Sequence, residues 1–262
     1  MGSVIWGLRG VKAGLTPGLV GGPLAGQNWK GPMPNPRKLS LSPEHVALVQ
    51  RQMTDPAPAP ATELHNDADY AEWVDRFQRQ NPDPAAPLRL FAYGSLIWKP
   101  EIAPVAEEVA LARGWHRSFC LRIVRFRGSP DVPGLMMVLD RGGACCGMLF
   151  TLPPEEPGPL LDRLFRREFT AKPINNIPRW IRVQTADGPK HALAFVMNRA
   201  SPHYAGRLSA EAVADVLARA CGQWGSGAEY LLNTVTHLEA KGIHDRHLWR
   251  LQALVAERIG RS

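Results

Sequence analysis

The sequence predicts an α+β fold: a small β-barrel or strongly curved mixed sheet with flanking helices, preceded by a helical N-terminal extension. Six short apolar runs separated by glycine and proline lie between residues 88 and 197, which is typical of a barrel built from short strands. Helical periodicity fills residues 208–259. The composition, 45% hydrophobic over 262 residues, is that of a protein that buries a core.

Residues 1–87 are predicted to be an extension, partly disordered, with two short helices. The first 26 residues are apolar and glycine-rich, but Arg9 and Lys12 interrupt them, so we expect a disordered tail or an artefact of start-site choice, with a targeting segment as the alternative. Ser42 before Pro43 predicts a helix start, and the helix is expected to continue through HVALVQRQM (45–53).

A second helix is predicted from Asp67 to Gln80, because four apolar residues recur there at helical spacing: Tyr70, Trp73, Val74 and Phe77. DPAPAPA (55–61) before it reads as an extended linker, and NPDPAAP (81–87) ends it. The main domain is therefore predicted to span residues 88–262.

In that domain, the predicted strands are 88–93, 119–126, 134–140, 145–152, 179–185 and 191–197. The segments 128–134, 141–143 and 187–189 are expected to separate them as turns. Three helices follow, at 208–222, 227–242 and 245–259. Ser209 caps the first of these and glycine stops it.

The net charge of +7 is uneven, since residues 1–87 carry 8 basic and 8 acidic residues and all the excess lies in 88–262. A basic domain suits an anionic small molecule, a nucleic acid or an acidic surface. Four cysteines without CxxC spacing predict reduced thiols and a cytoplasmic protein. No run of about 18 apolar residues is present, so no membrane span is expected.

A carboxylate stands on the apolar stripe of the helix predicted within 153–169. Glu168 lies four residues after Leu164, seven after Leu161 and three after Phe165, which places it on their face. Burial would raise its pKa and make it a usable acid and base. Exposure at the helix end, or pairing with Arg167 or Arg179, are the structural alternatives.

Gly94 and Ser95 directly follow the first strand of the domain. Such a turn bares consecutive backbone N–H groups that can hold a carboxylate or an oxyanion. A simple strand-ending turn is the alternative. Ser95 lacks the G-x-S-x-G context of a nucleophile, and the turn lacks the Gly-Lys-Ser/Thr of a phosphate loop.

Seven segments together resemble the ChaC-like glutathione-specific γ-glutamylcyclotransferases, particularly bacterial members, in order over about residues 88–258. They are YGSLIWKP (93–100), GWHRSFCL (114–121), GGACCGMLF (142–150), LFRRE (164–168), PRWIRV (178–183), VMNRASPHYAGRL (196–208) and EYLLNTVTHLEAKGIHD (229–245). Bacterial relatives typically have a Met-Leu-Thr-Gly-type link after the glutamate, whereas this chain has FTAKPINNI (169–177).

The resemblance implies a small barrel with flanking helices and an essential acid/base at Glu168. It implies that the γ-glutamyl group binds to the turn Tyr93, Gly94, Ser95, Leu96, Ile97 and Trp98, largely through backbone groups. Tyr204 is a further candidate for substrate binding, with structural packing as the alternative. The expected reaction converts glutathione to 5-oxoproline and Cys-Gly by attack of the substrate's own α-amine. It needs no protein nucleophile, metal or cofactor.

Other features of the sequence point to alternative functions. Activity on other γ-glutamyl amines or amino acids would use the same chemistry. Arg122 and Arg125 are candidates for a substrate carboxylate, although a solvated strand face fits them better. A nucleic-acid-binding module would use the basic and aromatic residues of LRIVRFRG (121–128), but only Phe126 could stack on a base. His237, His244 and His247 do not match a zinc spacing. We therefore expect a small-molecule substrate and no nucleic-acid, membrane or metal partner; the sequence predicts no oligomeric state.

Overall fold

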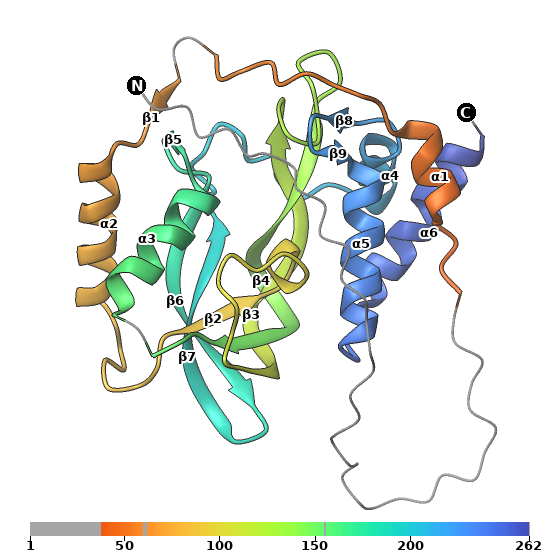
Figure 1. Ribbon diagram of the computed structural model, residues 1–262. Helices are drawn as coiled ribbons and strands as arrows, with labels where there is room; N and C mark the ends of the chain where they lie inside the picture. Colours follow the sequence, from red (N-terminus) through yellow and green to blue (C-terminus); the bar gives the residue numbers. More distant parts are fainter. Residues whose placement is uncertain (1–37, 60–61, 155, 262) are drawn as a thin grey trace, which may run out of the picture. The chain divides into compact units, whose positions relative to one another are not determined.

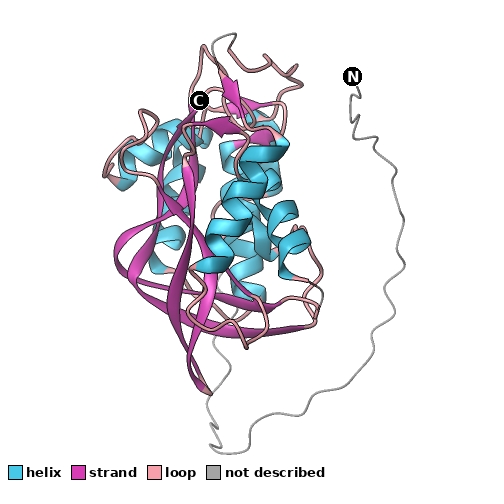
Figure 2. Cartoon of the chain, turned by 90° about the vertical axis from the view of Figure 1, so that its left-hand side faces the viewer, coloured by secondary structure: helices cyan, strands magenta, loops and turns pink. Residues whose placement is uncertain are grey.

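A closed five-stranded barrel forms the centre of the protein. The computed structural model describes residues 38–59, 62–154 and 156–261. The strands follow the order β2-β4-β3-β6-β7 around the barrel, and parallel pairing of β2 with β7 closes it (Figures 1 and 2). Their bounds are β2 Arg89–Ala92, β3 Ala106–Ile123, β4 Gly134–Thr151, β6 Asn176–Thr185 and β7 Gly188–Met197. The predicted α+β class with a small barrel is confirmed.

Strands β3 and β4 form a long antiparallel hairpin that the sequence pattern divided too finely. Its register runs from Ala106 opposite Thr151 to Ile123 opposite Gly134. The predicted turn at 141–143 is wrong: Gly142 and Gly143 take positive φ angles, 112° and 65°, inside β4. Glycine tolerates this conformation, so the strand bends without ending.

Two helices pack side by side against one side of the barrel (Figure 1). Helix α2 (Asp67–Arg79) begins at a capping box formed by Asn66 and Asp69. Helix α3 (Pro157–Glu168) starts with proline, which suits a first helical turn. Their facing stripes are apolar, with Phe77 of α2 edge-on to Phe165 of α3 at 5.7 Å.

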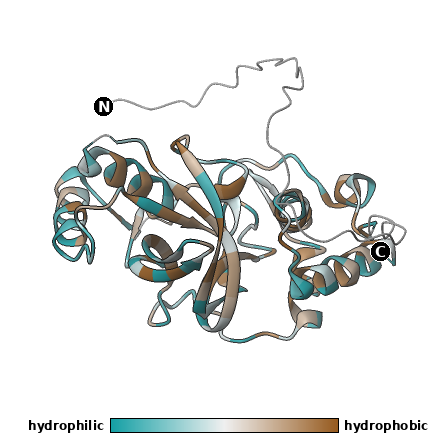
Figure 3. Cartoon of the chain, turned by 90° about the horizontal axis from the view of Figure 1, so that it is seen from below, coloured by the Kyte–Doolittle hydropathy of each residue, from teal (hydrophilic) through white to brown (hydrophobic). Residues whose placement is uncertain are grey.

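The remaining helices gather on the other side of the barrel (Figure 1). They are α1 Pro43–Val49, α4 Ala210–Leu217, α5 Gly227–Ala240 and α6 Arg246–Gly260. Helix α1 ends before the predicted limit at Met53. Helix α4 ends five residues before Gly222, because Cys221–Gly222 (β8) and Gly225–Ser226 (β9) pair as a small hairpin. Figure 3 shows that the helices carry both hydrophilic and hydrophobic faces.

One continuous core joins the barrel to helices from both halves of the chain. It includes Leu41 and Phe77 as well as Phe91 and Leu164. The predicted division between residues 87 and 88 stays a prediction. The tail predicted for residues 1–26 lies outside the described residues. Within the described residues, no helix has the length and apolar character needed to cross a membrane.

Candidate active site

The glycine turn after β2 is a short 3₁₀ helix, η1 (Ser95–Ile97). The amide of Ile97 donates to the carbonyl of Gly94 at 2.9 Å. The side chains of Leu96 and Ile97 are buried in the core, so their packing holds the turn in place. The backbone of Gly94 and Ser95 is thus held at the end of β2. The sequence predicted a turn at this place, but it did not predict that the turn is a 3₁₀ helix.

A close approach of two side chains explains why glycine stands at position 94. A Cβ atom there would lie 3.0 Å from Cε of Met137 and 3.1 Å from the hydroxyl oxygen of Tyr230. Both distances are shorter than ordinary van der Waals contact. The turn therefore meets β4 through Met137 and α5 through Tyr230, and a larger residue at position 94 would have to displace these two side chains.

Sequence reasoning missed Tyr230. In EYLL it follows the apolar periodicity of α5 and reads as core, and it is indeed buried. Its ring lies 5.7 Å from Trp98 and 6.1 Å, edge-on, from Phe119. The signal that could have found it is chemical, because a buried tyrosine needs a partner for its hydroxyl. That hydroxyl lies beside Gly94.

A buried arginine holds the first residue of the turn. Arg117 Nε donates to the carbonyl of Tyr93 at 2.7 Å, and another guanidinium nitrogen donates to the carbonyl of Cys146 at 2.6 Å. A third contact is an ion pair with Asp245 at 3.0 Å. The hydroxyl of Tyr93 donates to the carbonyl of Phe195 at 2.8 Å. Strands β2, β3, β4 and β7 and the start of α6 thereby meet at the turn.

Glu168 is the last residue of α3, and its side chain is 16% exposed. Burial raises the pKa of its carboxyl group, the charge of Arg167 opposes this, and the charge of Glu101 adds to it. Arg167 Nε lies 3.3 Å from Glu168 Oε1, so one of the pairings considered from the sequence exists. The carboxyl is nevertheless held mostly away from water at the end of the core-facing stripe.

The structure brings Glu168 and the glycine turn into one electrostatic environment. The charge of Glu168 raises the pKa of both Tyr93 and Tyr230, in addition to the larger effect of burial. The pKa of Tyr230 rises to about 12. At neutral pH this tyrosine is protonated and can donate a hydrogen bond. A buried carboxylate, a phenol and backbone amides around a turn are suited to proton transfer and to binding a carboxylate or oxyanion.

Tyr204 lies apart from these residues. Its hydroxyl donates to Oδ2 of Asp140 at 3.1 Å, and it packs against a separate apolar cluster that includes Cys120 and Val138. Asp140 also receives two hydrogen bonds from Arg199. The structure thus places Tyr204 with a buried carboxylate rather than with Glu168, and its role in substrate binding stays a prediction.

The other candidates have contacts of their own. Arg125 forms a two-point ion pair with Asp55, at 2.9 and 2.6 Å. His237 stacks on Trp98 at 5.3 Å. Among the residues that the structure describes, no group of three or more His, Cys, Asp or Glu is placed to hold a metal ion.

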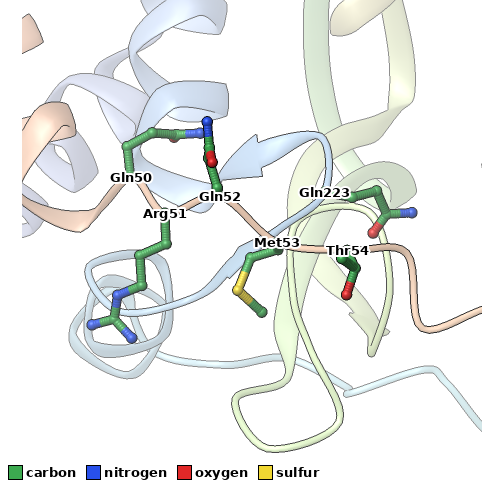
Figure 4. Close-up of a pocket in the computed structure, with 6 residues that line it drawn as sticks. All are labelled: Gln50, Arg51, Gln52, Met53, Thr54 and Gln223. Atoms are coloured by element: carbon green, nitrogen blue, oxygen red, sulfur yellow. The ribbon is translucent and has the colours of Figure 1, made fainter.

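Two cavities lie elsewhere on the protein. Figure 4 shows one of about 530 Å³, lined by Gln223 and the consecutive residues 50–54. The other, of about 280 Å³, is lined by Arg141, Ile177, Arg179, Val196, Met197, Asn198, Arg199 and Ala200. Neither is lined by a predicted site residue.

The closed barrel with its flanking helices has the γ-glutamylcyclotransferase fold. A solved structure described as a yeast γ-glutamyl cyclotransferase specific to glutathione matches with a TM-score of 0.59. It is 18% identical, and the match covers 66% of this chain and 97% of that one.

Sequence comparison narrows the class to a family. The model of the ChaC-like protein family matches residues 88–258. The chain is 33% identical to a glutathione-specific γ-glutamylcyclotransferase of Escherichia coli, covering 61% of this chain and 68% of that protein. It is 30% identical to glutathione-specific γ-glutamylcyclotransferase 1 of Homo sapiens, covering 71% and 83%. The protein belongs to the ChaC-like family.

Proposed function

We propose that this protein is a γ-glutamylcyclotransferase that cleaves glutathione to 5-oxoproline and Cys-Gly. The observation that carries the proposal is the buried carboxyl of Glu168, with its raised pKa, in the same environment as the turn at Gly94. The relatives named above support glutathione as the substrate.

The reaction is an intramolecular displacement. Glu168 as carboxylate accepts a proton from the substrate α-ammonium, and the freed amine attacks the γ-carbonyl carbon. The new C–N bond closes a five-membered ring. As the tetrahedral intermediate collapses, the old amide C–N bond breaks and Glu168 gives its proton to the departing nitrogen of Cys-Gly. The ring nitrogen then gives up its extra proton through Glu168 to the released amine, which leaves as an ammonium. The carboxyl ends each cycle ionised, and no other reactant is consumed.

The turn and the tyrosines orient the substrate. In this proposal the backbone amides of Gly94 to Leu96 hold the α-carboxylate or the developing oxyanion. The protonated hydroxyl of Tyr230 lies beside Gly94 and can donate to the same oxygen. Folding the substrate so that its nitrogen meets its own carbonyl contributes several kcal/mol, as an order of magnitude, to lowering the barrier.

The decisive experiment compares wild-type protein with Glu168→Gln. Purified wild type should release equimolar 5-oxoproline and Cys-Gly from glutathione, and Glu168→Gln should lower kcat by roughly 10²–10⁴-fold, the range expected for general acid–base catalysis. Glu108→Gln is the matched control, since Glu108 sits in an ion pair with Lys190 on the barrel. Activity retained in Glu168→Gln would refute the role of that carboxylate.

Other γ-glutamyl amines and amino acids belong in the same assay. A wild-type kcat/KM higher for one of them than for glutathione would reassign the substrate and leave the chemistry unchanged. We also propose a cytoplasmic location, supported by four free cysteines, because disulfides are rare in that compartment.

A further inference from the structure

A segment that precedes the residues matched by the family model packs against the C-terminal end of α3, the helix that carries Glu168. We call residues 63–79 the N-terminal clamp; it comprises β1 (Glu63–Leu64), His65, Asn66 and α2. The family match begins only at residue 88. Helix α3 ends at Glu168, and the clamp contacts the residues on both sides of that point.

The first grip is on the backbone just after Glu168. Strand β1 pairs antiparallel with β5 (Ala171–Lys172). The amide of His65 donates to the carbonyl of Thr170 at 2.9 Å, and the hydroxyl of Tyr70 donates to the carbonyl of Phe169 at 3.0 Å. The carbonyls of the first two residues after Glu168 are therefore both fixed by the clamp.

The second grip is an aromatic cage around Phe169, which is 5% exposed. The ring of Phe169 lies 5.4 Å from His65, 6.0 Å from Tyr70 and 5.6 Å from Trp73, all from the clamp. Phe165 of α3 completes the cage at 5.4 Å. Because neighbouring residues at the end of a helix move together, holding Phe169 restricts where the side chain of Glu168 can point.

His65 shows that packing dominates in this cage. Both nitrogens of its imidazole are buried, and neither has a hydrogen-bond partner. Leaving polar atoms unsatisfied is costly, so the position of the ring has to be stabilised by its contacts. The charged groups around it are Asp69, Lys172 and Glu63. Burial lowers the pKa of His65, Lys172 adds to this effect, and Asp69 and Glu63 oppose it.

Ion pairs fasten the outer side of the clamp. Lys172 bridges Glu63 at 2.9 Å and Asp69 at 2.8 Å. Arg166, two residues before Glu168, pairs with Asp67 at 2.8 Å, and its guanidinium lies 4.3 Å from the ring of Tyr70. The clamp thus contacts the last turn of α3 through Arg166 and the segment after Glu168 through Lys172.

We propose that the N-terminal clamp is a positioning element for the reaction, with Tyr70 and His65 as positioning residues that act on Glu168 through Phe169. The inference rests on the proposed function of Glu168. A carboxylate that must take up and return one proton requires a fixed geometry, and small misplacements lower rates steeply. The clamp should therefore affect the chemical step more than substrate binding, which takes place at the turn after β2.

The test uses His65→Ala and Tyr70→Phe in the full chain. We expect each to lower kcat about 5- to 50-fold, with KM changed less than twofold. The acid limb of the kcat/KM profile should move to lower pH, because a loosened Glu168 meets more water and its raised pKa falls. The charged groups that also act on this pKa are Arg167, which lowers it, and Glu101, which raises it; the neutral phenols Tyr93 and Tyr230 lie within reach of the charge of Glu168. His65→Phe, which keeps a ring in the cage, should restore kcat.

Trp180→Phe is the matched control. Its indole Nε1 donates to the carbonyl of Phe77 at 3.0 Å, the same kind of side-chain-to-carbonyl bond at the opposite end of the clamp. It should lower Tm without moving the pH profile. If His65→Ala and Tyr70→Phe lose activity only in proportion to the folded fraction, with an unmoved pH profile, the clamp is merely structural and the inference is overturned.

A readout without turnover separates this inference from the proposed function. The carboxyl pKa of Glu168 can be followed by infrared difference spectra against Glu168→Gln. A lower pKa in His65→Ala supports positioning even if glutathione is not the substrate. An unchanged pKa contradicts positioning even if wild type cleaves glutathione.

Discussion

Glu168 illustrates at the scale of a single residue how a sequence pattern can identify a chemically useful group. A carboxylate in register with Leu161 and Leu164 is expected to be largely buried, and it is. Burial disfavours the charged form and raises its pKa. The burial that makes Glu168 a stronger base also means that its ionised form destabilises the folded state.

The free energy of unfolding should therefore depend on pH through Glu168. Its pKa is raised on folding, so its contribution is fully present below the unfolded-state pKa and is lost as pH rises through the folded-state pKa. Replacing it with neutral glutamine removes that loss. We expect Glu168→Gln to raise Tm at pH 8, with a difference that shrinks towards pH 4. Thermal unfolding at a series of pH values measures this; a lower Tm for the variant at pH 8 would show that the pairing with Arg167 outweighs burial.

At the scale of elements, the turn after β2 is more constrained than its sequence suggests. Gly94 reads as an ordinary strand-ending glycine, and its partners Met137 and Tyr230 come from β4 and α5, far along the chain. No local pattern links three such segments. The role of the turn could be predicted only from a resemblance, whereas the reason for glycine required the packed structure.

Substitution at this turn gives a clear prediction. Gly94→Ala should lower kcat/KM at least about tenfold, because its Cβ displaces the hydroxyl of Tyr230, while stability falls by about 1–3 kcal/mol from overpacking. Gly158→Ala in α3 is the control, since a Cβ there meets only Val74 at 3.9 Å. Steady-state kinetics with both variants decides the matter. Equal kinetics for Gly94→Ala and wild type would contradict the close approach.

Element boundaries show where sequence reasoning was limited. The pattern found β6, β7 and the C-terminal helices, since their apolar spacing is regular. It missed the first 13 residues of the 18-residue strand β3, 106–118, where charged residues interrupt the apolar ones. It divided β4 into two strands, 134–140 and 145–152, because glycine usually marks a turn, whereas Gly142 and Gly143 here form a bend inside a long hairpin. The clamp was recognised as a helix, but its contact with Phe169 joins positions about 100 residues apart.

At the scale of the whole molecule, Arg117 links the barrel to the C-terminal helices. Its side chain is 2% exposed and pairs with Asp245, the N-cap residue of α6. It also satisfies carbonyls of β4 and of Tyr93 at the turn. This one side chain therefore connects β3 with the turn after β2, with β4 and with the start of α6.

Arg117→Ala should therefore destabilise the entire fold. Removing one partner of a buried ion pair costs about 3–5 kcal/mol, because the other charge stays buried. Urea denaturation should show a lower midpoint with an unchanged m-value. Arg250→Ala removes an exposed pair with Glu211 and should cost at most about 1 kcal/mol. Similar losses for the two variants would argue against a linking role for Arg117.

The buried cysteines have a consequence for an enzyme whose proposed substrate is itself a thiol. Burial raises the pKa of Cys120 and Cys145 to about 11, so roughly one molecule in 10⁴ carries either thiolate at pH 7. Exchange with glutathione disulfide requires a thiolate that can reach the attacking position, and these two sulfurs offer neither charge nor access. The protein can thus work in an oxidised glutathione pool without being glutathionylated at its own core.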